Sequence, residues 1–120
     1  MTVAQRKNHD KGVFIDVSAA AQRLSGVVNE TPLFLNVTYS EMYGAQVQLK
    51  REDLQTVRSY KIRGSYNKIT ALMEADATVA HVVCASAGNH AQGVALSCKL
   101  LQIKGTIFMP SPTPNQKINQ

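Results

Sequence analysis

The sequence predicts an α/β fold: part of a three-layer parallel sheet whose strands are joined by crossover helices. Residues 78–85 form a nearly continuous apolar run, typical of a central strand covered on both faces, and 105–109 predict a further strand. Residues 62–73 and 89–101 carry apolar side chains at helical spacing instead. Strands that alternate with helices across short connections form parallel sheets, which bind ligands at the carboxyl ends of their strands.

The first elements are predicted from helix caps and turn residues. Polar residues without a period predict a loose arm over 1–17. Ser18 is expected to cap a short helix, and Pro32 to precede an extended segment. The apolar face of that helix would be formed by Ala20, Leu24, Val27 and Val28.

The next residues predict a second short helix and a strand. Ser40 is expected to cap the helix, which would stop near Gly44. Residues 46–50 alternate polar and apolar side chains as a half-buried strand does, and a charged loop is expected over 50–58. At the other end of the sequence, three prolines precede a polar segment that could open another helix.

Composition limits the kinds of ligand and partner. With 120 residues, 44% of them hydrophobic, the chain can form one modest core. A net charge of +5 favours anionic ligands without choosing among them. The basic cluster from Arg51 to Lys68 is interrupted by Glu52 and Asp53 and accompanies no nucleic-acid-binding motif, so no nucleic-acid partner is expected.

The sequence lacks the signatures of secreted, membrane-spanning, metal-binding and nucleotide-binding proteins. No N-terminal apolar run is long enough for a signal peptide or a membrane span, so we expect a soluble, cytoplasmic protein without a membrane partner. Cys84 and Cys98 lack the spacing of metal ligands, so we expect reduced core residues and no metal site. The common dinucleotide, nucleoside-triphosphate and zinc-protease motifs do not occur.

Lys61 is the first candidate for chemistry, because it begins the helix predicted over 62–73. A lysine in such a place is normally a solvated surface group. It becomes a nucleophile or base near neutral pH only where burial or a nearby cation lowers its pKa, and Arg58 and Arg63 could supply that charge. The apolar stripe of this helix is Ile62, Tyr66, Ile69 and Met73.

The second candidate is the segment 86–90, between a predicted strand and a predicted helix. A tight loop there turns backbone N–H groups toward a carboxylate or phosphate, although a plain turn is the alternative. Asn89 favours turns and offers a ligand both a donor and an acceptor, whereas His90 alone is more often a structural partner than a base. The helix face that follows is Ala91, Val94 or Ala95, Cys98 and Leu101.

Five motifs occur together in the order and spacing of one known family: TPL, LKREDLQ, VRSYKIRGSYN, CASAGNHAQGVA and IFMP. By these motifs the sequence resembles the fold-type II pyridoxal-phosphate enzymes, and within them the threonine and serine dehydratases. The resemblance implies that Lys61 holds pyridoxal 5′-phosphate through a Schiff base and takes the Cα proton of an amino-acid substrate. It also implies that Asn89 hydrogen-bonds the 3′-oxygen of the cofactor ring. The substrate carboxylate would be held by Ser86, Ala87, Gly88, Asn89 and His90.

The activity implied is conversion of L-threonine to 2-oxobutanoate and ammonia, the first step of isoleucine biosynthesis. Ala87 stands where the similar serine racemases carry a second serine, which favours elimination over racemisation. A serine-preferring dehydratase is one alternative, and a truncated, non-catalytic binding module is another.

Residues 18–120 are expected to be an incomplete catalytic domain. In the family a glycine-rich loop binds the cofactor phosphate and a serine or threonine meets the pyridine nitrogen, and this sequence contains neither. We therefore expect a fragment that is poorly stable, aggregation-prone and inactive alone. Its full-length form is expected to be a homo-oligomer.

Overall fold

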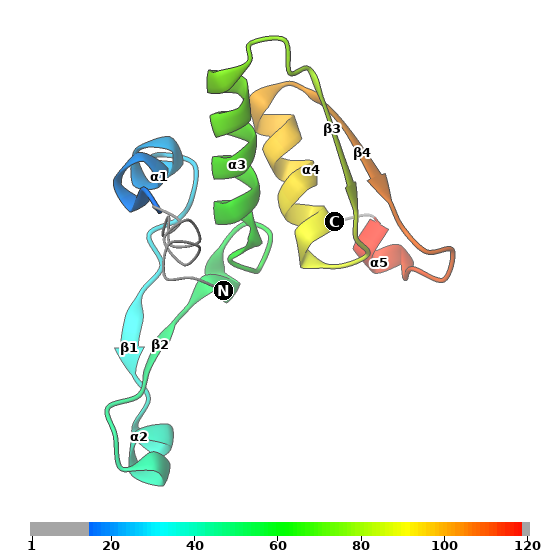
Figure 1. The fold of residues 1–120 in the computed structure, drawn as a ribbon. Helices are drawn as coiled ribbons and strands as arrows, with labels where there is room; N and C mark the ends of the chain where they lie inside the picture. Colours follow the sequence, from blue (N-terminus) through cyan, green and yellow to red (C-terminus); the bar gives the residue numbers. More distant parts are fainter. Residues whose placement is uncertain (1–14, 119–120) are drawn as a thin grey trace, which may run out of the picture.

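The computed structural model describes residues 15–118, which form a helical body and a projecting arm (Figure 1). In the body, α4 (Asn89–Leu101) lies between α3 (Lys61–Ala75) and a ribbon of two strands, β3 (His81–Ala85) and β4 (Lys104–Phe108). The arm consists of β1 (Leu33–Leu35), α2 (Val37–Tyr43) and β2 (Gln48–Lys50). The other elements are α1 (Val17–Leu24), the 3₁₀ turn η2 (Glu52–Leu54) and α5 (Asn115–Ile118).

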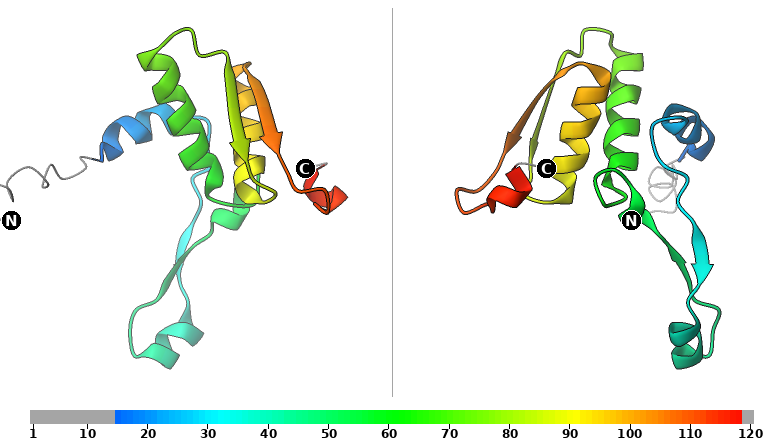
Figure 2. Two further views of the ribbon diagram at one scale, coloured as in Figure 1. Left: turned by 45° about the vertical axis from the view of Figure 1, so that its right-hand side comes forward. Right: turned by 180° about the vertical axis from the view of Figure 1, so that it is seen from behind.

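The β3–β4 ribbon is parallel, as predicted, with α4 as the crossover. Its register runs from His81 beside Lys104 to Ala85 beside Phe108. α4 covers one face of the ribbon (Figure 2), so exposure alternates along β3. Val83, on the other face, is 57% exposed. The prediction that this strand is covered on both faces is therefore wrong within residues 15–118, where only the face toward α4 is covered.

The single three-layer parallel sheet of the prediction is corrected to two small sheets in the part of the chain described. β2 pairs antiparallel with β1, Leu33 lying beside Lys50, and does not join the β3–β4 ribbon. The alternation of strands and helices was right about the order of elements, but it does not specify which strands pair. β2 is also not half-buried: all three of its residues are exposed.

The core lies where α3 packs on α4. Ile69, Val94 and Cys98 are each at most 4% exposed and form the central cluster. The predicted apolar faces of both helices are thus confirmed in their central residues, and α4 spans the predicted residues 89–101. Cys98 is a free thiol whose pKa is raised by burial, as expected for an unreactive core cysteine. Cys84 is free and half-buried against the same cluster.

Helix α1 begins earlier than predicted. Asp16, not Ser18, is its cap: the Asp16 carboxylate accepts a hydrogen bond from the Ala19 N–H at 2.8 Å. Val27 and Val28 lie in the turn after the helix and do not extend its face. Most of the predicted arm, 1–17, lies outside the described residues.

The cap of α2 is corrected in the same way. Asn36, not Ser40, caps the helix, accepting from the Tyr39 N–H at 2.9 Å. Ser40 lies inside α2, where its hydroxyl donates to the Asn36 carbonyl at 2.7 Å and accepts from the Val47 N–H at 3.0 Å. The predicted stop at Gly44 is confirmed, since Gly44 adopts a left-handed φ of 60°. Where several capping residues lie close together, local propensity alone does not choose among them.

The arm leaves much apolar surface uncovered. The radius of gyration of the Cα atoms is 18.8 Å, whereas a compact domain of 100 residues has about 13 Å. Exposed apolar side chains of the arm include Leu33, Leu35, Val37, Met42 and Tyr43. Within residues 15–118, no helix combines the length and apolar character needed to cross a membrane.

Candidate functional site

Lys61 is the first residue of α3, as predicted, and its backbone lies directly against α4. A Cβ atom on Gly93 would lie 3.0 Å from both the carbonyl carbon and the carbonyl oxygen of Lys61. Two buried hydroxyls fasten this contact: Ser97 donates to the Gly93 carbonyl at 2.7 Å, and Ser65 lies 2.9 Å from Ser97. Ser65 also reaches the Lys61 carbonyl at 2.9 Å. The first residue of α3, Lys61, is therefore packed against Gly93, which lies one helical turn after the first residue of α4.

The segment 86–90 lies at the carboxyl end of β3, as predicted. β3 ends at Ala85, and the N–H of Ser86 donates to the Phe108 carbonyl at 3.0 Å. Gly88 is the cap of α4 and has no side chain with which to cap the helix, while its own N–H donates to the Ser86 hydroxyl at 3.3 Å. Asn89 begins the helix.

A hollow of about 400 Å³ opens beside this loop at the ends of both parallel strands. Its lining includes Ser86 and Ala87 from the loop and Phe108, Met109 and Pro110 from the end of β4. A hollow of this size can hold a small ligand. The two predicted site segments thus come to the same end of the body, because α3 and α4 both begin there (Figure 2).

The charges around Lys61 differ from the expectation in one respect. Arg63 is paired with Glu52, its Nε lying 2.8 Å from Oε2, so its charge is compensated by a carboxylate. Arg58 forms no ion pair among the described residues and adopts a left-handed φ of 54°. The Lys61 ammonium lies 4.8 Å from the centroid of the Tyr60 ring, within range of a cation–π contact.

Ser59 is a polar group that sequence reasoning missed. The residue is 7% exposed, and its Oγ has no hydrogen-bond partner among the described residues. A buried hydroxyl without a partner costs about 1–3 kcal/mol, and a ligand or water bonded to it removes that cost; Thr70, within α3, has a second such hydroxyl. This end of the body therefore offers a half-buried lysine, an unpaired hydroxyl and the beginning of helix α4, whose dipole favours an anionic ligand.

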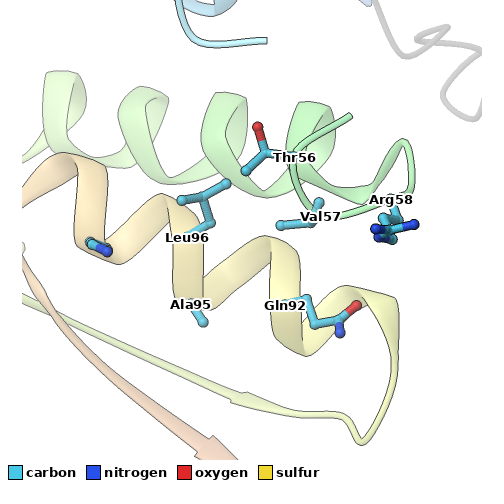
Figure 3. Close-up of a pocket in the computed structure, with 7 residues that line it drawn as sticks. Thr56, Val57, Arg58, Gln92, Ala95 and Leu96 are labelled. Atoms are coloured by element: carbon cyan, nitrogen blue, oxygen red, sulfur yellow. The ribbon is translucent and has the colours of Figure 1, made fainter. Parts of the chain in front are cut away.

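A second hollow, of about 360 Å³, lies on the side of α4 (Figure 3). It lies between the loop that carries Thr56, Val57 and Arg58 and the side chains of Gln92, Ala95, Leu96 and Lys99. None of the predicted site residues lines it. The hollow at the strand ends is lined by two of the predicted site residues, Ser86 and Ala87, whereas Lys61 and Asn89 do not line it.

An α/β unit with a turn at the ends of parallel strands and a lysine at the beginning of a neighbouring helix is typical of the broad class of ligand-binding α/β enzymes. Comparison with known proteins defines the family. The sequence profile of the family described as "Pyridoxal-phosphate dependent enzyme" matches residues 24–120. The chain belongs to this family, whose members depend on pyridoxal phosphate.

Two bacterial relatives match most of the chain. It is 57% identical over 101 residues to the biosynthetic L-threonine dehydratase of Bacillus subtilis (strain 168), covering 84% of this chain and 24% of that protein. It is 52% identical over 103 residues to the protein of the same description from Mycobacterium leprae (strain TN), covering 86% and 24%. The chain therefore spans about a quarter of the length of these relatives.

Solved structures share the fold. A threonine deaminase isoform 2 from Solanum lycopersicum, in its processed form, matches with a TM-score of 0.72 and 42% identity, over 86% of this chain and 28% of that one. A pyridoxal 5′-phosphate-dependent aspartate racemase matches with a TM-score of 0.79 and 33% identity, over 87% and 33%. Threonine deaminases and a racemase thus share this arrangement of elements.

Proposed function

We propose that this chain supplies the cofactor lysine and the substrate-carboxylate loop of a threonine dehydratase, which converts L-threonine to 2-oxobutanoate and ammonia. The observation that carries the proposal is the packing of α3 on α4, which brings Lys61 and the 86–90 loop to one end of the body. Identities of 52% and 57% to biosynthetic threonine dehydratases support the substrate and the place in isoleucine synthesis. Because the chain spans a quarter of those proteins, the activity also needs residues from beyond the matched part.

In this proposal each segment has one task. Lys61 would hold pyridoxal phosphate through its amine, and once the substrate's amino group had taken that place, the released amine would take the proton from the substrate Cα. Asn89 hydrogen-bonds the 3′-oxygen of the cofactor ring, and the backbone amides of 86–90 hold the substrate carboxylate. When bound, the cofactor withdraws electrons from Cα, so that the proton can leave and the β-hydroxyl can be expelled.

Racemisation is the second candidate activity, because the solved structures of similar fold include racemases. The aspartate racemase is 33% identical and a maize serine racemase 34%, against 42% for the tomato threonine deaminase. Ala87 carries no hydroxyl that could return a proton to the other face of Cα. Both the identities and Ala87 favour elimination.

The test has two parts. In the first, the chain is incubated with pyridoxal phosphate, reduced with borohydride and digested, and the modified lysine is found by mass spectrometry. We expect modification at Lys61, and not at the exposed Lys104, at low cofactor concentration. Equal modification of both lysines would contradict the assignment of Lys61.

The second part measures turnover in a chimera in which this chain replaces the matching segment of the Bacillus subtilis relative. We expect 2-oxobutanoate from L-threonine, loss of activity in Lys61→Ala, and retained activity in Lys104→Ala. A higher kcat/KM for serine would favour the serine-preferring alternative, and D-amino-acid formation would favour the racemase. The proposal also includes a homo-oligomer for the longer protein, which sedimentation of the chimera would test.

A further inference from the structure

The charged segment before Lys61 is exposed in most of its residues, but Glu52 and Gln55 are held by hydrogen bonds to the rest of the body. Glu52, in η2, has a side chain that is 14% exposed. Its two carboxylate oxygens accept separate hydrogen bonds from Arg63, Nε to Oε2 at 2.8 Å and Nη2 to Oε1 at 2.8 Å. The Thr31 hydroxyl donates to the same carboxylate at 2.6 Å. Paired bonds of this kind fix the direction of a guanidinium as well as its distance.

A second set of hydrogen bonds joins the η2 turn, which carries Glu52, to Asn29. Gln55 is 4% exposed, and its amide pairs with the Asn29 backbone: Nε2 donates to the Asn29 carbonyl at 2.9 Å and Oε1 accepts from the Asn29 N–H at 3.0 Å. The Asn29 side chain donates to the Leu54 carbonyl at 3.1 Å. The turn that carries Glu52 is therefore attached to residues 29–31 on one side and to α3 on the other.

Arg63 transmits this constraint to Lys61. The two residues lie in the same first turn of α3, and the N–H of Arg63 donates to the Tyr60 carbonyl at 3.0 Å. On its other side that turn is held by Gly93 and Ser65 of the α3–α4 contact. Glu52 is thus the point at which the preceding loop is bonded to the turn that carries the lysine.

We propose that Glu52 is a positioning residue for Lys61: its paired bonds to Arg63 fix the first turn of α3 and so the place of the lysine amine. This inference rests on the proposed role of Lys61 in binding the cofactor. Glu52 touches neither substrate nor cofactor in this proposal. Its effect passes through Arg63.

Glu74 provides a matched control. It lies near the far end of the same helix and forms a more exposed ion pair with Arg23, whose Nε and Nη2 both contact Oε2, at 2.9 and 2.7 Å; this pair ties α3 to α1. Glu52→Gln and Glu74→Gln each remove one carboxylate charge paired with an arginine. Glu52→Gln weakens the contact at the first turn of α3, and Glu74→Gln weakens the contact at its last turn.

The first measurement needs no cofactor: amide hydrogen exchange along α3. In Glu52→Gln we expect exchange at residues 63–66 to rise about tenfold relative to residues 72–75. In Glu74→Gln this ratio should not rise. A general loss of stability would accelerate both ends of the helix together, so an unchanged ratio in Glu52→Gln would overturn the inference.

The second measurement is borohydride-trapped modification of Lys61 at a fixed, subsaturating cofactor concentration. We expect roughly a tenfold loss in Glu52→Gln, since a displaced amine loses the benefit of orientation. Arg63→Lys keeps the charge but not the paired geometry, and should fall between Glu52→Gln and the unsubstituted chain. Undiminished modification of Lys61 in Glu52→Gln would contradict the positioning role of Glu52 but not the proposed function of Lys61. Absence of Lys61 modification in the unsubstituted chain would instead count against the proposed function, and the exchange ratio would still decide the role of Glu52.

Discussion

Gly93 of α4 lies in contact with the carbonyl group of Lys61. A Cβ on residue 93 would come within 3.0 Å of the Lys61 carbonyl carbon and oxygen and of the Ser65 hydroxyl. Backbone atoms inside a helix cannot move aside as a flexible side chain can. The closeness of the two helices at the candidate site therefore depends on the absence of a side chain at this position.

Gly93→Ala is expected to destabilise the chain by about 1–3 kcal/mol and to displace the first turn of α3, because overpacking forces backbone shifts. The free energy of unfolding in urea, followed by circular dichroism, measures the effect. Gly64→Ala is the matched control: a Cβ there meets nothing within 4 Å, so it should stabilise α3 by up to about 1 kcal/mol. Equal effects of the two substitutions would rule out the contact as the cause.

Stability is expected to fall in acid through Glu52. Its hydrogen bond from Arg63 is the largest cause that lowers its pKa from the ordinary 4.5 to about 2. A carboxyl whose folded pKa is lowered stabilises the fold above its unfolded pKa, and that contribution disappears as pH falls from about 4.5 to about 2. We expect this contribution to be about 3 kcal/mol near neutral pH.

Urea denaturation at several pH values tests this expectation. Glu52→Gln should flatten the curve of unfolding free energy between pH 4.5 and 2. The pKa of Glu74 is also lowered by its bond from Arg23, but its side chain is 52% exposed, so Glu74→Gln should flatten the curve much less. A pH profile unaffected by Glu52→Gln would show that its ion pair contributes nothing to stability.

Gln102→Gly is expected to raise the free energy of unfolding by about 0.5–1 kcal/mol. Gln102 ends α4 in the left-handed region, with φ of 56°, where a side chain is strained and glycine is not. Gln102→Ala keeps the strain and should give no gain, which separates backbone freedom from loss of the side chain. Thermal unfolding of the three proteins side by side makes the comparison.

Val83→Lys is expected to reduce self-association of the chain with little loss of stability. Val83 is 57% exposed on the uncovered face of β3, and each strand of a two-stranded ribbon has a free edge that invites further pairing. Sedimentation velocity measures the change in association. Val82→Lys, whose side chain packs against the core cluster, should instead unfold the body, and similar behaviour of both variants would contradict the assignment of the two faces.

The sequence allowed the local features to be predicted. The start of α3 at Lys61, the extent of α4, the glycine stop of α2 and the 86–90 loop at a strand end all follow from periodicity and from residues that favour or break helices within a few positions. The family could be identified because several local motifs occur in one order. The chemical roles of Lys61, Asn89 and the loop remain predictions for the experiments above.

Contacts between distant residues were decided by the tertiary structure alone. The pairing of β2 with β1, the open face of β3, the Glu52–Arg63 bonds and the Gly93–Lys61 contact each join segments whose sequences carry no signal of the partner. The charged run at 50–58 illustrates the difference. Its composition predicts a charged loop and no partner for any of its side chains, but folding brings Glu52 to Arg63 and Gln55 to Asn29, where burial makes each of these polar groups need a partner.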